Sequence, residues 1–249
     1  MAEMVMGDGG VASVVSQLSE SLAHQASGAV DGSVQRVVTY EWELTDHSVG
    51  SGERSSSLEA VRVDRLLTPD GFARVIERRG QELDEDGRLP RAALAREEAV
   101  VSDEMASGPP EGAEYPDLLL TDFAALAERI APDCPGDARC IGEALIALHS
   151  TYVVDPLLGA ALWEVLGGTE GVVLLGETLD RLGRPAVALQ VPGHDAEHVT
   201  VIFADLERGA FLGSESILVT SRPGDGLVAP AVVSFSALAY AVLESDLAP

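Results

Sequence analysis

Hydrophobic residues recur every three or four positions in four separate stretches of the chain, which is the period of an α-helix with one buried face. Two of these stretches also carry helix-start signals, because Thr121 and Asp155 can cap a helix and Pro156 suits a first helical position. Gly167 and Gly168 can end the last of them. The predicted helices are Val11–His24, Asp122–Ala131, Ala138–Ser150 and a fourth from Pro156 to Leu166.

Other stretches alternate apolar and polar residues, which is the period of a β-strand with one buried face. In the strand predicted at Val34–Leu44, Tyr40 and Trp42 share one face and glutamates share the other. Short connections rich in Asp, Gly and Pro join the later strands, so we expect these to be antiparallel neighbours in a meander. The predicted strands are Val34–Leu44, Leu58–Leu67, Phe72–Arg79, Val172–Thr178, Pro185–Val191, Val199–Asp205, Ala210–Val219 and Val232–Val242.

These elements predict an α+β fold in which a curved antiparallel sheet of about seven to nine strands packs on three or four helices. We expect one domain over residues 1–249, with an N-terminal helix and strands at 11–104, a helical insertion at 116–167 and the C-terminal meander at 171–242. His47–Ser57 and Met105–Glu114 have the Ser, Gly and Pro content that is typical of loops. The first meander strand is apolar on both faces, which indicates that both faces of that sheet are covered.

The chain carries 41 acidic and 16 basic residues, which gives a net charge of −25 at pH 7. Such a charge repels phosphate backbones and anionic lipid, so the composition argues against nucleic-acid partners and against anionic membrane surfaces. All the basic residues are arginines, which excludes chemistry that needs a Schiff-base or P-loop lysine. No apolar run could span a membrane and the N-terminus lacks the positive region of a signal peptide, so we expect a soluble chain.

Recognisable catalytic motifs are missing from the sequence. No serine stands in a Gly-x-Ser-x-Gly turn, and no glycine-rich loop both follows a strand and opens a helix. We therefore expect no bound cofactor and favour a function other than catalysis.

Two pairs of closely spaced residues are of types that bind metal ions or form disulfides. His194 and His198 would share one face of a helix, but here they span a Pro-Gly turn that runs into a strand, and no third ligand is evident. We interpret them as a polar turn and predict no metal site. Cys134 and Cys140 have the spacing of a small disulfide loop, which requires an oxidising compartment; two unrelated thiols are the alternative.

The stretch Val154–Val219 resembles the C-terminal part of a family of uncharacterised, membrane-anchored actinobacterial ectodomains. The family pattern is a capped helix of the form Pro-x-Leu-x-x-Ala-Leu, a Pro-Gly-Val that leads into a strand, an Asp-x-x-Gly-Arg turn and then Phe-Asp-x-x-x-Gly-x-Leu-Leu-Gly-Glu. This chain departs from it, because it lacks the proline before Gly171 and has Glu215 one place late. The residues that carry it are Pro156, Leu158, Ala161, Leu162, Gly171, Val172, Asp180, Gly183, Arg184, Phe203, Asp205, Gly209, Phe211, Leu212 and Gly213. They cover about a quarter of the chain and are residues of turns and packing, so they concern the fold.

This family is similar in fold to periplasmic lipoprotein carriers, mycobacterial lipid-binding lipoproteins and envelope-stress regulators that bind anti-sigma factors. The resemblance implies a lipoprotein-carrier-like sheet that wraps helices around an apolar cavity, and an extracytoplasmic location. Relatives carry an N-terminal transmembrane helix that this chain lacks, so a cytoplasmic location is the alternative. The candidate cavity residues are Tyr40, Trp42, Phe72, Leu158, Leu162 and Phe203, for which core packing is the alternative reading.

Three functions are compatible with these observations. The first is a non-enzymatic binding module, the outward-facing part of an envelope protein, that holds a hydrophobic or lipid-like ligand or a protein partner between sheet and helices. The second is an enzyme that folds a small apolar substrate in the same cavity, for instance a cyclase of natural-product assembly. The third is a structural interaction domain with a solid core. We favour the first.

Overall fold

The computed structural model describes most of the chain, with the N-terminus, the C-terminus and several connections left out. The predicted loop at His47–Ser57 lies outside the described residues, as does most of the loop predicted at Met105–Glu114. The first residues of that second loop, Met105–Ser107, belong to a strand, so the loop prediction is wrong there. The described ranges are 10–25, 34–44, 59–68, 72–84, 87–89, 99–107, 123–222 and 227–244.

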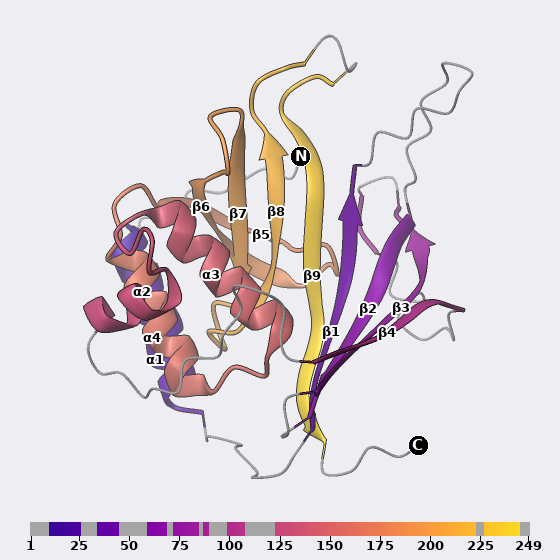
Figure 1. Ribbon diagram of the computed structural model, residues 1–249. Coiled ribbons are helices and arrows are strands. Elements are labelled where there is room, and N and C mark those ends of the chain that lie inside the picture. The colour runs from indigo at the N-terminus through magenta and orange to yellow at the C-terminus, as the bar shows by residue number, and fades with distance from the viewer. Residues whose placement is uncertain are drawn as a thin grey trace.

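Within these ranges the chain forms four helices and nine strands, which confirms the α+β prediction (Figure 1). The helices are α1 (Val11–Ala23), α2 (Phe123–Ile130), α3 (Ala138–Thr151) and α4 (Pro156–Gly167). The strands are β1 (Val34–Glu43), β2 (Glu59–Leu67), β3 (Phe72–Glu82), β4 (Val100–Ser107), β5 (Val173–Leu179), β6 (Pro185–Pro192), β7 (His198–Ala204), β8 (Phe211–Leu218) and β9 (Ala231–Glu244). Each predicted element is present, and β4 is one that the sequence analysis missed.

All nine strands belong to one antiparallel sheet, in the order β4-β3-β2-β1-β9-β8-β7-β6-β5. The meander predicted for the C-terminal strands is therefore confirmed, and the N-terminal strands form a second run of neighbours. The two runs meet where β1 pairs with β9, from Val34 opposite Glu244 to Glu43 opposite Ser234. This pairing joins segments about 200 residues apart in the sequence.

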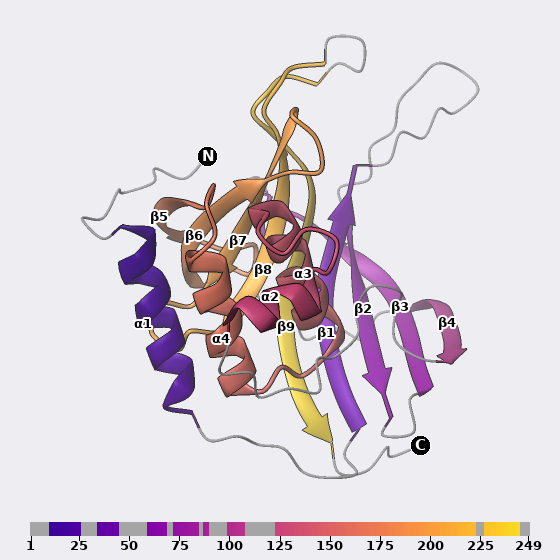
Figure 2. The same ribbon diagram turned by 60° about the vertical axis from the view of Figure 1, so that its left-hand side comes forward.

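The helices cover one face of the C-terminal half of the sheet. Figures 1 and 2 show them over β5–β8, while β2–β4 extend past them to the other side. The helices and the apolar residues of β6 and β7 form the main core, which includes Leu189 and Ile202. Trp163 of α4 is fully buried in it, and its indole Nε1 donates a hydrogen bond of 2.8 Å to the Gly209 carbonyl.

The opposite face, which we call the outer face, is also covered. Tyr40, Phe235 and Ala237 pack there against Leu89 and against Leu182 of the β5–β6 turn. The Leu89 backbone N–H donates to the Arg181 carbonyl at 2.8 Å, which fixes that cover in place. This cover lies over β1 and β9. The prediction that both faces are covered was made for the first meander strand, β5, and it is not met there, because Val173 is exposed.

No helix in the described part of the chain combines the length and the apolar character that a membrane span needs.

Helices α1 and α4 approach so closely that only glycine fits at one contact. A Cβ atom added at Gly167 would lie 2.6–2.8 Å from the Val15 side chain. We therefore expect Gly167→Ala to lower the free energy of unfolding by about 1–3 kcal/mol, the usual cost of overpacking. Urea unfolding followed by circular dichroism measures this. Gly136→Ala is the matched control, because a Cβ there meets nothing within 4 Å; equal losses in the two variants would contradict the packing argument.

The buried His149 makes the stability of the fold depend on pH. Its ring stacks on Phe211 at 4.8 Å between centroids, its Nε2 has no hydrogen-bond partner among the described residues, and burial lowers its pKa to about 3. The unfolded chain regains the ordinary pKa near 6.5 and binds the extra proton. The stability that neutral His149 provides is therefore complete above about pH 6.5 and is lost as the pH falls from there towards 3.

We expect His149→Phe to flatten the pH dependence of unfolding below pH 6.5. One proton accounts for at most about 1.4 kcal/mol per pH unit, and the phenyl ring keeps the stack on Phe211. Urea unfolding at pH 7 and pH 5 compares the variant with the wild type. The exposed His24 supplies the control substitution, His24→Gln, which should leave the difference between the two pH values unchanged.

Candidate functional site

One hollow among the described residues is a groove on the helix-side face of the sheet, with a volume of about 640 Å³. It crosses the join between the two halves of the sheet, because β1, β2 and β3 supply one side and β7, β8 and β9 the other. We call it the helix-side groove. Its lining residues are Glu41, Trp42, Glu43, Val61, Val63, Glu77, Thr200, Ser214, Glu215, Ser216, Ser234, Phe235 and Ser236.

A row of hydroxyl groups forms the floor of the helix-side groove over β7, β8 and β9. Ser214 pairs with Ile202, which packs in the helix core, so Ser214 lies on the helix side of the sheet. Residues opposite one another in a ladder share a face. The same register aligns Ser214 with Ser236 and places Ser216 between Thr200 and Ser234.

Three glutamates add negative charge to this floor. Glu41 lies opposite Ser236, accepts a hydrogen bond of 2.6 Å from Thr39 Oγ1, and forms an ion pair of 2.8 Å with Arg65 Nη1. Glu43 and Glu77 also line the groove, and neither forms an ion pair with another described residue. Acids that lack a positive partner leave the groove with surplus negative charge.

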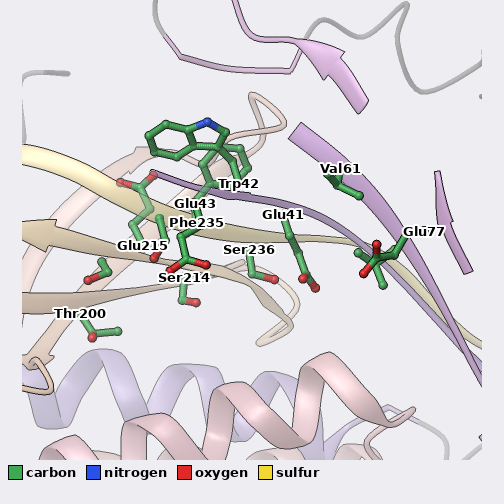
Figure 3. A pocket seen from close by; sticks show the side chains of 13 residues that line it. Glu41, Trp42, Glu43, Val61, Glu77, Thr200, Ser214, Glu215, Phe235 and Ser236 are labelled. Carbon is green, nitrogen blue, oxygen red and sulfur yellow. The ribbon is translucent and has the colours of Figure 1, made fainter. Parts of the chain in front are cut away.

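The aromatic residues beside the groove belong to the outer face. Figure 3 shows Thr200, Ser214, Ser236 and Glu41 directed towards the helices, whereas the Trp42 indole stands on the opposite side of the sheet. The Trp42 ring is stacked on Phe235, with 6.1 Å between centroids. The groove is therefore polar where it faces the helices.

A second hollow, of about 440 Å³, lies on the outer face, and we call it the outer pocket. Aliphatic and aromatic side chains form most of it, and two arginines stand at its edge. Arg184 is held by Asp180, which accepts from its Nε at 2.7 Å. Arg62 Nε is buried and has no hydrogen-bond partner among the described residues. The pocket is lined by Val38, Tyr40, Arg62, Leu182, Arg184, Ala239 and Tyr240.

Next to the outer pocket, a buried carboxylate collects three arginines. The side chain of Asp64 is 1% exposed and contacts Arg36 at 3.2 Å, Arg62 at 3.1 Å and Arg78 at 3.0 Å. Burial alone would raise the pKa of Asp64, but the hydrogen bond from Arg78 and the charges of Arg62 and Arg36 outweigh it and hold that pKa below its usual value. This cluster fixes β1, β2 and β3 to one another.

The six residues predicted to line a ligand cavity do not gather at one place. Leu158 and Leu162 pack in the main core among the helices. Tyr40 and Trp42 belong to the outer-face cluster, where Tyr40 also lines the outer pocket and Trp42 borders the helix-side groove. Phe203 packs in a third cluster with Val201 and Leu212. Phe72 begins β3, and its side chain lies outside the described residues.

The serines and threonine of the groove floor were missed by the sequence analysis, although the signal is present. Ser214 and Ser216 alternate in one strand, and Ser234 and Ser236 alternate in another. Because alternate residues of a strand share a face, this spacing predicts two hydroxyl rows. Only the β8–β9 register shows that the rows lie side by side.

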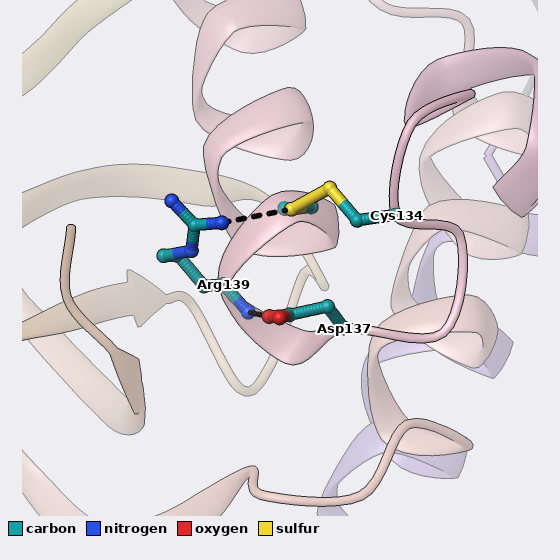
Figure 4. Close-up of a disulfide and its surroundings, with 4 residues drawn as sticks. Cys134, Asp137 and Arg139 are labelled. Carbon is teal, nitrogen blue, oxygen red and sulfur yellow. Dashed lines mark hydrogen bonds between the residues drawn. A yellow bond between two sulfur atoms is a disulfide. The ribbon is translucent and has the colours of Figure 1, made fainter. Parts of the chain in front are cut away.

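The two cysteines are joined in a disulfide between the α2–α3 connection, which contains Cys134, and the first turn of α3, which contains Cys140 (Figure 4). A second interaction stabilises the intervening turn. The Asp137 carboxylate caps α3 by accepting a hydrogen bond of 2.8 Å from the Arg139 backbone N–H. Arg139 Nη2 also lies 3.5 Å from the Cys140 sulfur. The disulfide therefore ties the connecting segment to the start of α3.

Comparisons with known proteins leave the chain without an assigned family. No family model matches it, and no curated protein sequence matches it. Among solved structures, it is similar to a domain named for outer membrane lipoprotein sorting from Vibrio parahaemolyticus, at 9% identity over 96% of this chain and 93% of that one. The TM-score of 0.23 is too low to establish a common fold, so the lipoprotein-carrier-like resemblance stays a prediction.

Proposed function

We propose that this chain is a binding module and that its partner lies in the helix-side groove. The observation that carries the proposal is the groove itself, which spans six strands and presents a row of five hydroxyl groups beside three glutamates. Such a surface offers many hydrogen-bonding positions and no arrangement of nucleophile and base that would mark a catalyst. Recognition is the function that this arrangement supports best.

The chemistry of the groove favours a polar partner with positive charges. An acyl chain would leave the hydroxyl groups and carboxylates of the floor without hydrogen-bond partners, at a cost in free energy for each. A peptide segment with lysine or arginine side chains would instead pair with Glu43 and Glu77 and donate hydrogen bonds to the serines. Of the two partner classes that the sequence analysis left open, the groove supports a protein segment over a lipid.

An extracytoplasmic location belongs to the same proposal. Disulfides persist in oxidising compartments and are rare in the cytosol. The bond between Cys134 and Cys140 is part of the helical layer, because Cys140 packs in the main core. The resemblance to membrane-anchored ectodomains points to the same location.

A titration with a soluble peptide of alternating lysine and serine tests the groove. We expect binding detected by calorimetry, with amide resonance shifts concentrated in β1, β3 and β7–β9. The double variant Glu43→Gln/Glu77→Gln should bind about three- to tenfold more weakly, because exposed ion pairs contribute up to about 1 kcal/mol each. Added salt should weaken binding to the wild type more than binding to the variant.

The double variant Glu170→Gln/Glu207→Gln is the matched control, since both glutamates are exposed outside the groove and the pair removes the same two charges. Equal weakening by control and double variant would show that only net charge matters and would reject the groove. Native mass spectrometry of protein purified under mild conditions tests the lipid alternative. An acyl ligand that co-purifies with the chain would contradict the polar partner.

A further inference from the structure

The β6–β7 turn brings two histidines and an aspartate together. The Asp195 carboxylate lies 2.6 Å from His198 Nδ1 through one oxygen and 3.2 Å from His194 Nε2 through the other. The two imidazole rings stack, with 4.4 Å between their centroids. One ligand atom from each of the three residues lies within 4.8 Å of the others. The polar turn expected from the sequence is present, and Asp195 supplies the third group that the spacing of the histidines did not reveal.

The backbone holds this turn in one conformation. The Gly193 N–H donates to the His198 carbonyl at 3.1 Å, and the Glu197 N–H donates to the Asp195 carboxylate at 2.8 Å. The Val219 N–H donates to the Glu197 carbonyl at 2.7 Å, which ties the turn to the end of β8. A Cβ atom at Gly193 would lie 2.6 Å from the His198 backbone, so glycine is needed for this close approach.

The three side chains differ in their exposure to solvent. The His198 side chain is 5% exposed, whereas Asp195 is 42% and His194 is 63% exposed. A hydrogen bond between His198 and Asp195 accounts for two members of the cluster. The contact of His194 with the second Asp195 oxygen and the stack of its ring on His198 bring the third, exposed side chain back over the other two.

We propose that His194, Asp195 and His198 bind a divalent transition-metal ion of the zinc class. Two imidazole nitrogens and one carboxylate oxygen are donors that Zn²⁺ accepts, at about 2.0–2.2 Å. Ligand atoms around such an ion stand about 3.3 Å apart at tetrahedral angles. Asp195 already lies at about this distance from His194, at 3.2 Å, and closer to His198, at 2.6 Å, where the metal ion would widen the contact. Rotation of the exposed His194 side chain brings the two histidine nitrogens together.

Binding replaces a proton with the metal ion. The ion takes the position between His198 Nδ1 and Asp195 that a hydrogen bond now fills. A neutral His198 then carries its one proton on Nε2, and an imidazolium releases its second proton to solvent. With three protein ligands, at least one coordination position stays open for water or for a donor atom of another molecule. The net charge of −25 also favours accumulation of cations near the surface.

Calorimetric titration of the full chain with ZnCl₂ tests the site, after treatment with EDTA and without a histidine tag. We expect one ion per chain with a dissociation constant in the micromolar range or below. His194→Ala and Asp195→Asn should each weaken binding at least tenfold, because each removes one of only three ligands. Both residues are exposed enough that the variants should fold, which circular dichroism verifies. Co²⁺ should give visible absorption bands of a low-symmetry site in the wild type alone.

His24→Ala is the control, because His24 is an exposed histidine at the end of α1, far from this turn in the sequence. It should leave affinity and stoichiometry unchanged. Absence of Zn²⁺ binding at micromolar concentrations would overturn the proposal. So would binding that persists at full strength in His194→Ala and Asp195→Asn, since the ion would then be held elsewhere.

Discussion

The pairing of β1 with β9 is the interaction on which the rest of this structure depends. Ten residue pairs join the strands, and a register shift between Val38 and Thr39 bends the ladder near its middle. Without this ladder the chain would have two smaller sheets, each with an open edge that invites other pairings. The ladder also creates the helix-side groove, because Glu41 of one half lies opposite Ser236 of the other.

Local patterns in the sequence were enough to predict the helices, most of the strands and the antiparallel meander. They did not reveal the β1–β9 pairing, because which distant strands become neighbours is not encoded in the period of either one. Strand β4 was missed for a different reason. Its residues Ser102, Asp103 and Glu104 lie at the sheet edge, where no buried face imposes an apolar alternation.

The sequence pattern of a single strand does not predict what packs against each of its faces, and the candidate site depends on this. The alternation in β1 correctly places Tyr40 and Trp42 on one face, but it does not say what covers that face. The helices cover the other one, and Leu89 and Leu182 cover the aromatics. An aromatic pair on a strand is equally compatible with a cavity wall and with packing beneath a connection, so the sequence could not choose between them.

Charged side chains are distributed unequally between the two faces of the sheet. Glu41 and Glu77 lie on the helix side, while Arg62 and Arg78 lie on the outer face around Asp64. On the helix side Glu41 is paired with Arg65, whereas on the outer face several arginines share the one carboxylate of Asp64. The two faces of the sheet therefore differ in local charge, although the chain as a whole is strongly acidic. A basic partner of the kind proposed would be attracted by the whole molecule, and the local charge would then favour the helix side over the outer face. Discrimination between the two hollows would follow from this difference, because a specific surface combines attraction for one partner with repulsion of another.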